Sequence, residues 1–257
     1  MAALTMQELQ VPQRAPTRWR WFYVGMASVF VLIAFGGFVP TYWSRLASGT
    51  FGGAPILHLH GALFFAWTLF FLAQTLLVAT GRTPDHRSWG LAGISLATAM
   101  AITVVLAAMN SFRVAEGIGM RDAALRFSYV SLTGVVLFAG FVGAAIANVR
   151  RPEVHKRLML LSMIPLMHAA TARVFATLFA PPDAVGPPPV FVSVPPGLLV
   201  DGLIVAALVH DWRTRGRPHP VTVVGGVVLL ATQLLALPLS ATAGWMSIAR
   251  WVASLVG

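Results

Sequence analysis

Histidine is the residue type in this sequence whose placement best fits redox or metal chemistry. Imidazole is a preferred ligand of haem iron, copper and zinc. His60 and His168 fall inside apolar stretches, whereas His86, His155 and His210 fall at the ends of three such stretches. The chain has no cysteine, which excludes thiolate ligands, iron–sulfur clusters and disulfides. We therefore expect one site with His60 and His168 and a second metal or haem site with His86, His155 and His210.

Two further ionisable residues, Arg173 and Asp201, also lie inside apolar stretches. A charged group in a bilayer costs about 2.5–3.5 kcal/mol on insertion scales, so such residues usually have a function or a partner. At a rise of about 1.5 Å per residue, His60, Arg173 and Asp201 come at similar depths. We expect Arg173 and Asp201 to form an ion pair. It is either a structural bridge between two helices or part of a site in which Arg173 holds an anionic group, such as a haem propionate, a quinone carbonyl or a carboxylate.

The second apolar stretch carries a row of aromatic and polar residues on one helix face. His60, Phe64, Trp67, Phe71 and Gln74 are spaced four, three, four and three apart, which places them on the same side of a helix. This face is either aromatic core packing with two polar ends or one wall of a flat cofactor pocket. In the second interpretation His60, Trp67 and Gln74 contact the cofactor.

Methionines at four-residue spacing suggest copper as an alternative to haem b. Met159, Met163 and Met167 end beside His168, and thioether ligands favour Cu(I). The same stripe is also typical of plain packing, because methionine fills irregular gaps in a core.

The elements that position these residues are membrane-spanning helices. The 257 residues are 57% hydrophobic and 10% charged, against about 25% charged in a typical soluble protein, and the mean hydropathy is +0.77. The net charge of +10 sits in short clusters between apolar runs, which argues against nucleic-acid binding. A span needs roughly 20 apolar residues. Seven stretches qualify, at about 21–40, 54–80, 88–109, 127–149, 158–180, 194–212 and 221–237.

Lysine and arginine in the connecting segments predict the orientation. Loops on one side carry more of them at every comparison, which makes that side cytoplasmic. The prediction is an all-α integral membrane protein, a seven-helix bundle with its N-terminus in the cytoplasm and its C-terminus outside. We divide it into a polar tail at 1–20, a bundle at 21–240 and a C-terminal extension at 241–257. If Pro238 ends the last span, residues 241–256 form a short interfacial helix.

Short motifs give the chain a resemblance to known sequences. They are His60-Gly61 with Trp67, His86-Arg87, His155-Lys156-Arg157-Leu158-Met159 and His210-Asp211-Trp212. The chain resembles a group of uncharacterised bacterial multi-span membrane proteins, classed as a domain of unknown function, over about two thirds of its length. It is also partly similar to membrane b-type cytochromes. The resemblance implies the bacterial inner membrane and no established activity.

These observations favour a haem- or metal-binding membrane protein of an electron-transfer system, linked to quinone and to a redox partner protein. The alternative from a different class is an accessory or assembly subunit of a larger membrane complex, with no cofactor of its own. A copper-handling membrane protein is the third interpretation. All three place the chain in a lipid bilayer, and none involves nucleic acid.

Overall fold

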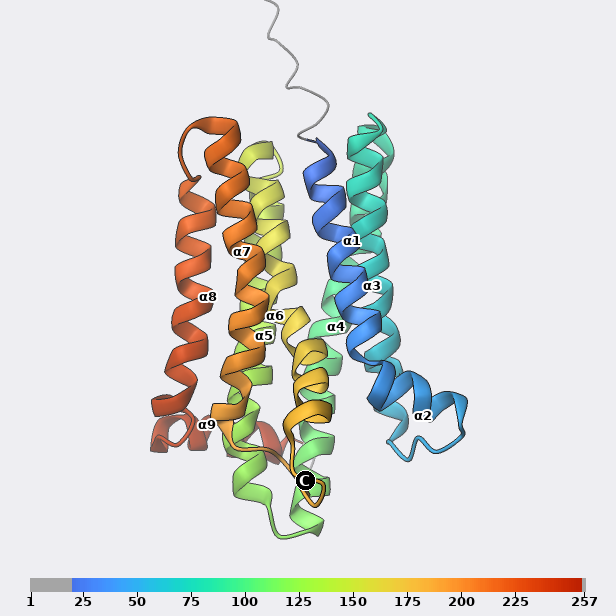
Figure 1. Cartoon of the computed structure of the whole chain (residues 1–257), viewed down its shortest axis with the longest axis vertical. Helices are drawn as coiled ribbons and strands as arrows, with labels where there is room; N and C mark the ends of the chain where they lie inside the picture. Colours follow the sequence, from blue (N-terminus) through green and yellow to red (C-terminus); the bar gives the residue numbers. More distant parts are fainter. Residues whose placement is uncertain (1–19, 256–257) are drawn as a thin grey trace, which may run out of the picture.

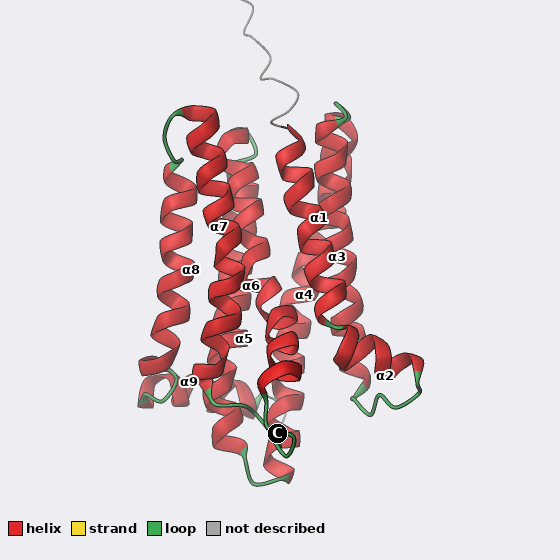
Figure 2. Ribbon diagram, in the orientation of Figure 1, coloured by secondary structure: helices red, strands yellow, loops and turns green. Residues whose placement is uncertain are grey.

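The structure is a computed structural model that describes residues 20–255, and within that range it is helical and contains no strand (Figures 1 and 2). Seven of its helices are long and apolar enough to cross a membrane. The prediction of an all-α, seven-helix membrane bundle is therefore confirmed. The expected polar tail at 1–20 lies outside the described residues except for its last position.

The elements follow one another along the chain with short connections. They are α1 (Arg20–Gly37), the π-helical turn η2 (Val39–Trp43), α2 (Ser44–Ala47), α3 (Pro55–Ala79), α4 (Thr83–Gly117), α5 (Arg121–Ala147), α6 (Pro152–Phe179), the 3₁₀ turn η3 (Val190–Ser193), α7 (Val194–Arg215), α8 (Pro220–Leu239) and α9 (Ala243–Ser254).

Proline and glycine mark several helix ends. Pro55, Pro152 and Pro220 are the first residues of α3, α6 and α8, where proline's fixed φ suits the helix and its missing N–H is not needed. Gly216 ends α7 with φ +72°, a left-handed conformation that favours glycine. The chain then turns back directly into α8, so the basic ends of α7 and α8 lie side by side (Figure 1).

The helix α6 packs against four others: α1, α5, α7 and α8. A Cβ atom on Gly37 of α1 would meet the carbonyl oxygen of Ala170 at 2.5 Å, so glycine lets α1 approach α6 closely there. Pro165 lies inside α6, where it removes one backbone hydrogen bond and favours a bend. Because of these contacts, residues on α6 face several parts of the molecule.

The core contains the inner half of the aromatic face predicted on α3, by which we mean the half from Trp67 to Gln74. Trp67 and Phe71 are buried, and the Trp67 indole N–H donates to the sulfur of Met163 at 3.2 Å. The Trp67 ring also meets Phe138 edge to face, with centroids 5.3 Å apart. Met163 thus belongs to the core and has a hydrogen-bonding role there.

Several helix boundaries differ from the predicted spans, and those of the third and last spans differ in ways that affect the ends of the bundle. The third span continues as α4 over 35 residues (Thr83–Gly117), well beyond the predicted 88–109, because its polar ends project past the apolar stretch. The last span ends at Leu239, one residue after Pro238, and α9 follows as a separate helix packed against α4 and α5. In Figure 1 α9 lies at the end of the bundle opposite the start of α1.

Candidate functional site

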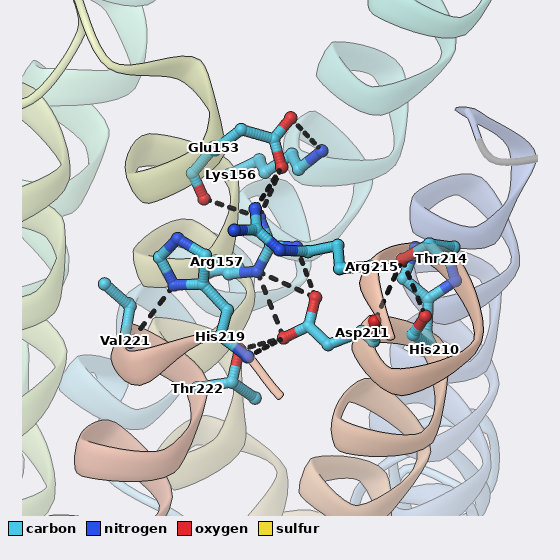
Figure 3. Close-up of polar contacts among 10 residues, drawn as sticks. All are labelled: Glu153, Lys156, Arg157, His210, Asp211, Thr214, Arg215, His219, Val221 and Thr222. Carbon is cyan, nitrogen blue, oxygen red and sulfur yellow. Dashed lines mark hydrogen bonds and ion pairs between the residues drawn. The ribbon is translucent and has the colours of Figure 1, made fainter. Parts of the chain in front are cut away.

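The most deeply buried ion pair among residues 20–255 joins α6 to α7. It lies at the end of the bundle where α6 and α8 begin and α7 ends, which we call the basic end. Arg157 Nε donates to both carboxylate oxygens of Asp211, at 2.9 and 3.1 Å, and Arg157 Nη2 donates to Oδ1 (Figure 3). Both side chains are almost fully buried, at 4% and 2% exposed. Guanidinium and carboxylate meet as two planar forks, a geometry that gives strong charge-assisted hydrogen bonds. We call this pair the clasp.

Further groups satisfy the remaining donors and acceptors of the clasp. Arg157 Nη1 donates to the backbone oxygen and to the carboxylate of Glu153, each at 2.7 Å. Glu153 in turn receives Lys156 Nζ at 2.6 Å and lies 3.5 Å from Arg215 Nη1. A buried ion pair is tolerated when such additional hydrogen bonds complete it.

The start of α8 is held by the same carboxylate. Asp211 Oδ2 accepts from the Thr222 hydroxyl at 2.6 Å and from the His219 backbone N–H at 3.2 Å. The His219 ring caps α8, because its Nδ1 accepts from the Val221 N–H at 3.1 Å. Burial lowers the pKa of His219, and the nearby Arg157 and Arg215 lower it further. The clasp therefore ties together α6, α7 and α8 and leaves no room for a ligand.

His86, His155 and His210, which were predicted to form the second metal or haem site, do not converge on one point. His210 stacks on Phe22, with ring centroids 3.8 Å apart. His86 and His155 lie together, with centroids 6.2 Å apart. Within residues 20–255, no group of three or more histidine, aspartate or glutamate side chains is placed to hold a metal ion. The predicted site is thus reduced to the pair His86 and His155.

A cavity of about 60 Å³ lies between α5, α6, α7 and α8. It lies toward the end of the bundle that carries α9, and Pro165 forms part of its wall. Space of this size accommodates several water molecules or the polar end of a larger molecule. The polar side chains in its lining are Tyr129, Thr133, His168, Ser193, Asp201, Thr232 and Gln233.

Two of these side chains hold the start of α7. His168 Nε2 lies 2.7 Å from the Ser193 carbonyl oxygen. Because a carbonyl only accepts, Nε2 carries the hydrogen and Nδ1 is left as the acceptor. Gln233 Nε2 donates to the Val194 carbonyl oxygen at 3.1 Å. If His168 acts as a ligand, as predicted, Nδ1 is the ring nitrogen that remains for it, because Nε2 makes this structural hydrogen bond.

The ion pair predicted between Arg173 and Asp201 is not formed. Asp201 lines the cavity, where its buried Oδ2 has no hydrogen-bond partner in the described structure. Arg173 does not line that cavity, and the charged group that acts on it is another cation, Arg45. The prediction was wrong because equal depth along two helices does not fix the direction in which each side chain points.

His60 and His168 do not share a site. The cavity that His168 lines receives no side chain from α3. The His60 ring packs on Phe64, with centroids 4.4 Å apart, and its buried Nδ1 has no partner in the described residues. Gln74 is buried as well, and its Oε1 also lacks a partner there. His60 and Gln74, the two polar ends of the α3 face, are thus both separate from the cavity.

Sequence reasoning missed the clasp, although Arg157 and Asp211 stand in the motifs that carry the resemblance. The sequence did contain one signal for this contact. Arg157, near the start of one span, and Asp211, near the end of the next, come at the same depth in the membrane. It also missed Tyr129 and Gln233 as cavity residues, because single polar residues in a helix carry no such signal.

Comparison of this chain with protein-family models, with curated proteins and with solved structures gives no match in any of the three. The resemblance to bacterial multi-span proteins and to b-type cytochromes therefore stays a prediction.

Proposed function

We propose that this chain is a quinone-linked protein of a membrane electron-transfer system, and that it binds the polar head of the quinone in the cavity lined by His168 and Asp201. The observation that carries the proposal is the buried Asp201 Oδ2, which has no hydrogen-bond partner among residues 20–255 and belongs to the cavity lining. A buried polar atom without a partner is costly, so a ligand that supplies one is favoured.

The lining suits a molecule with both donor and acceptor oxygens. Asp201 accepts a hydrogen bond from a quinol hydroxyl, and in its protonated form donates one to a quinone carbonyl. The Tyr129 hydroxyl is a second donor for a carbonyl. Val130, Leu137 and Leu229 supply apolar wall, as is usual in sites for small organic molecules.

The ligand reaches the cavity from the side of the bundle. Asp201 and Gln233 are only half-buried, so the cavity extends to the surface of the membrane-spanning part. A lipid-soluble molecule places its polar head there while its tail stays in the hydrocarbon. The small volume excludes burial of the whole molecule.

The substitution Gly197→Ala is designed to block the site without removing a polar group. A Cβ atom at Gly197 would lie 2.5–2.7 Å from the side-chain amide of Gln233, whereas a Cβ at Gly202 on the same helix has nothing within 4 Å. Gly197→Ala therefore pushes the Gln233 side chain out of its place, and Gly202→Ala is the matched control.

The experiment measures binding of a short-chain ubiquinone to the full chain purified in detergent, by equilibrium dialysis. We expect saturable binding by the unchanged protein and by Gly202→Ala. We expect weaker binding by at least tenfold in Gly197→Ala and in Asp201→Asn. Saturable binding that neither variant affects would contradict the proposal, as would no binding at all.

A second function, that of an accessory subunit without a cofactor, is favoured by the structural use of the polar groups. The clasp and the His168–Ser193 hydrogen bond both join helices rather than facing open space. Purification from native membranes in mild detergent tests it. A stoichiometric partner protein together with a featureless visible spectrum and no quinone supports this alternative and opposes the first.

A further inference from the structure

The pair His86 and His155 forms a separate polar centre at the basic end of the bundle. His86 lies in the first turn of α4 and His155 in the first turn of α6, 69 positions later in the chain. Their ring centroids are 6.2 Å apart and their planes are inclined by 80°. The two imidazoles come from different helices, so their proximity is a result of the fold.

The orientation of His155 is fixed by a backbone group. Its Nδ1 lies 2.9 Å from the carbonyl oxygen of Ala145 in the last turn of α5, and that oxygen also accepts from the Asn148 backbone N–H at 3.1 Å. Because the carbonyl accepts, Nδ1 carries the hydrogen, and neutral His155 keeps its lone pair on Nε2. A backbone carbonyl that orients an imidazole in this way is a usual companion of a metal-binding histidine.

His86 has a nitrogen that is buried and unused. Its Nδ1 is one of the few buried side-chain atoms without a hydrogen-bond partner in residues 20–255. Leaving such an atom without a partner costs free energy. One nitrogen of each ring is therefore available, and the two rings are neighbours.

We propose that His86 and His155 bind one Cu(I) ion. Metal–imidazole bonds of about 2.0–2.1 Å place the centres of two opposed rings roughly 6 Å apart, which matches the observed separation. No acidic side chain completes a larger ligand set in the described residues. Zinc takes four ligands and calcium or magnesium takes oxygen, whereas Cu(I) is a filled-shell ion that accepts two opposed nitrogen ligands.

The charge of the surroundings also favours a monovalent ion. Arg87 adjoins His86 and acts on it electrostatically, and repulsion from such a cation grows with the charge of the bound ion. Because His155 and Ala145 belong to the ends of α6 and α5, the bound ion also links α4 to that corner of the bundle.

The test is a titration of the full chain in detergent with Cu(I), under reducing conditions and against a chromophoric Cu(I) chelator. We expect one equivalent of copper to resist the chelator in the unchanged protein and none in His86→Ala or His155→Ala. His58→Ala is the matched control. His58 lies in the first turn of α3, at the opposite end of the bundle from His86 and His155, and its Nδ1 lies 2.9 Å from the Tyr42 hydroxyl. This control should retain the copper.

X-ray absorption of the copper-loaded, unchanged protein gives a second readout that needs no variant. We expect two imidazole nitrogens and no sulfur as nearest neighbours. Sulfur neighbours would assign the copper to methionine side chains and overturn the proposal. Copper that is absent, or that persists in both histidine variants, would overturn it as well.

Discussion

The guanidinium of Arg157 and the carboxylate of Asp211 face each other in a buried, multiply hydrogen-bonded pair, 54 positions apart in the chain. The carboxylate also receives hydrogen bonds from the start of α8. Removing Arg157 leaves the Asp211 carboxylate buried without its paired cation, with only the hydrogen bonds from Thr222 and His219. Such a loss is more costly than the net contribution of the intact pair.

Arg157→Ala is therefore expected to lower the free energy of unfolding by about 3–5 kcal/mol. Unfolding with SDS in mixed micelles, followed by tryptophan fluorescence, measures it. The double variant Arg157→Met with Asp211→Leu should lose less than the sum of the two single variants, because no uncompensated charge remains.

The control for this prediction is Arg82→Ala. Arg82 pairs with Asp85 at 2.8 Å, but both side chains are exposed, so the loss should stay below about 1 kcal/mol. Equal losses in Arg82→Ala and Arg157→Ala would show that burial of the clasp has no energetic consequence.

His219 makes stability depend on pH. Its pKa is lowered by burial and by the nearby arginines, so on acidification the unfolded chain binds a proton at His219 before the folded protein does. Stability is fully present above the unfolded value of about 6.5 and falls as pH drops from 7 toward 5. Protonation of Nδ1 also removes the cap on the Val221 N–H.

The variant His219→Asn isolates this effect. Asparagine still caps a helix N-terminus but does not titrate in this range, so the loss of stability between pH 7 and pH 5 should become smaller. The measurement is the SDS midpoint at several pH values. An identical pH dependence in His219→Asn would rule out His219 as its source.

The hydrogen bond from Trp67 to Met163 predicts a difference between two methionines of α6. Met163→Leu leaves the buried indole N–H without an acceptor, which costs about 1–3 kcal/mol. Met167→Leu makes the same chemical change at a residue that is also buried, and should cost less because no Met167 hydrogen bond is lost. The SDS unfolding midpoints of the two variants test this prediction. Equal midpoints would show that the Met163 sulfur does not stabilise the protein as a hydrogen-bond acceptor.

Trp245 attaches α9 to the bundle. Its indole N–H donates to the Leu125 carbonyl oxygen at 3.0 Å, and its ring meets Tyr129 at 4.9 Å between centroids. Trp245→Phe removes the hydrogen bond and should make the segment after Leu239 more susceptible to limited proteolysis. Trp251→Phe, at a position that is 62% exposed, should not. Cleavage at the same rate in both variants would contradict this attachment.

The helices could be predicted from the sequence, because a run of about 20 apolar residues in a chain with so little charge has few possible structures other than a membrane-spanning helix. The sequence was also sufficient for the inner half of the α3 face, since the spacing of Trp67 and Phe71 placed them on one side and both are buried. Period and length are local properties, and these predictions required nothing else.

Which side chains meet across helices could not be predicted. The pairing of Arg173 with Asp201 was inferred from depth, but the contact depends on how each helix is rotated about its axis. That rotation is set by packing such as the close approach of Gly37 to Ala170, which involves residues with no chemistry of their own. Because the rotation of each helix about its axis was unknown, the contact between Arg157 and Asp211 could not be predicted either.

The position of α9 has a consequence for the order in which the bundle is completed during synthesis. Trp245 donates to a carbonyl that precedes it by 120 positions, so this contact forms only after α6, α7, α8 and the start of α9 have left the ribosome. Until then the α4 and α5 surfaces that contact Met246, Ala249 and Val252 are without their final partner. Packing of these α4 and α5 surfaces therefore waits for the segment that follows the last span, and truncation before α9 should leave them without their protein partner.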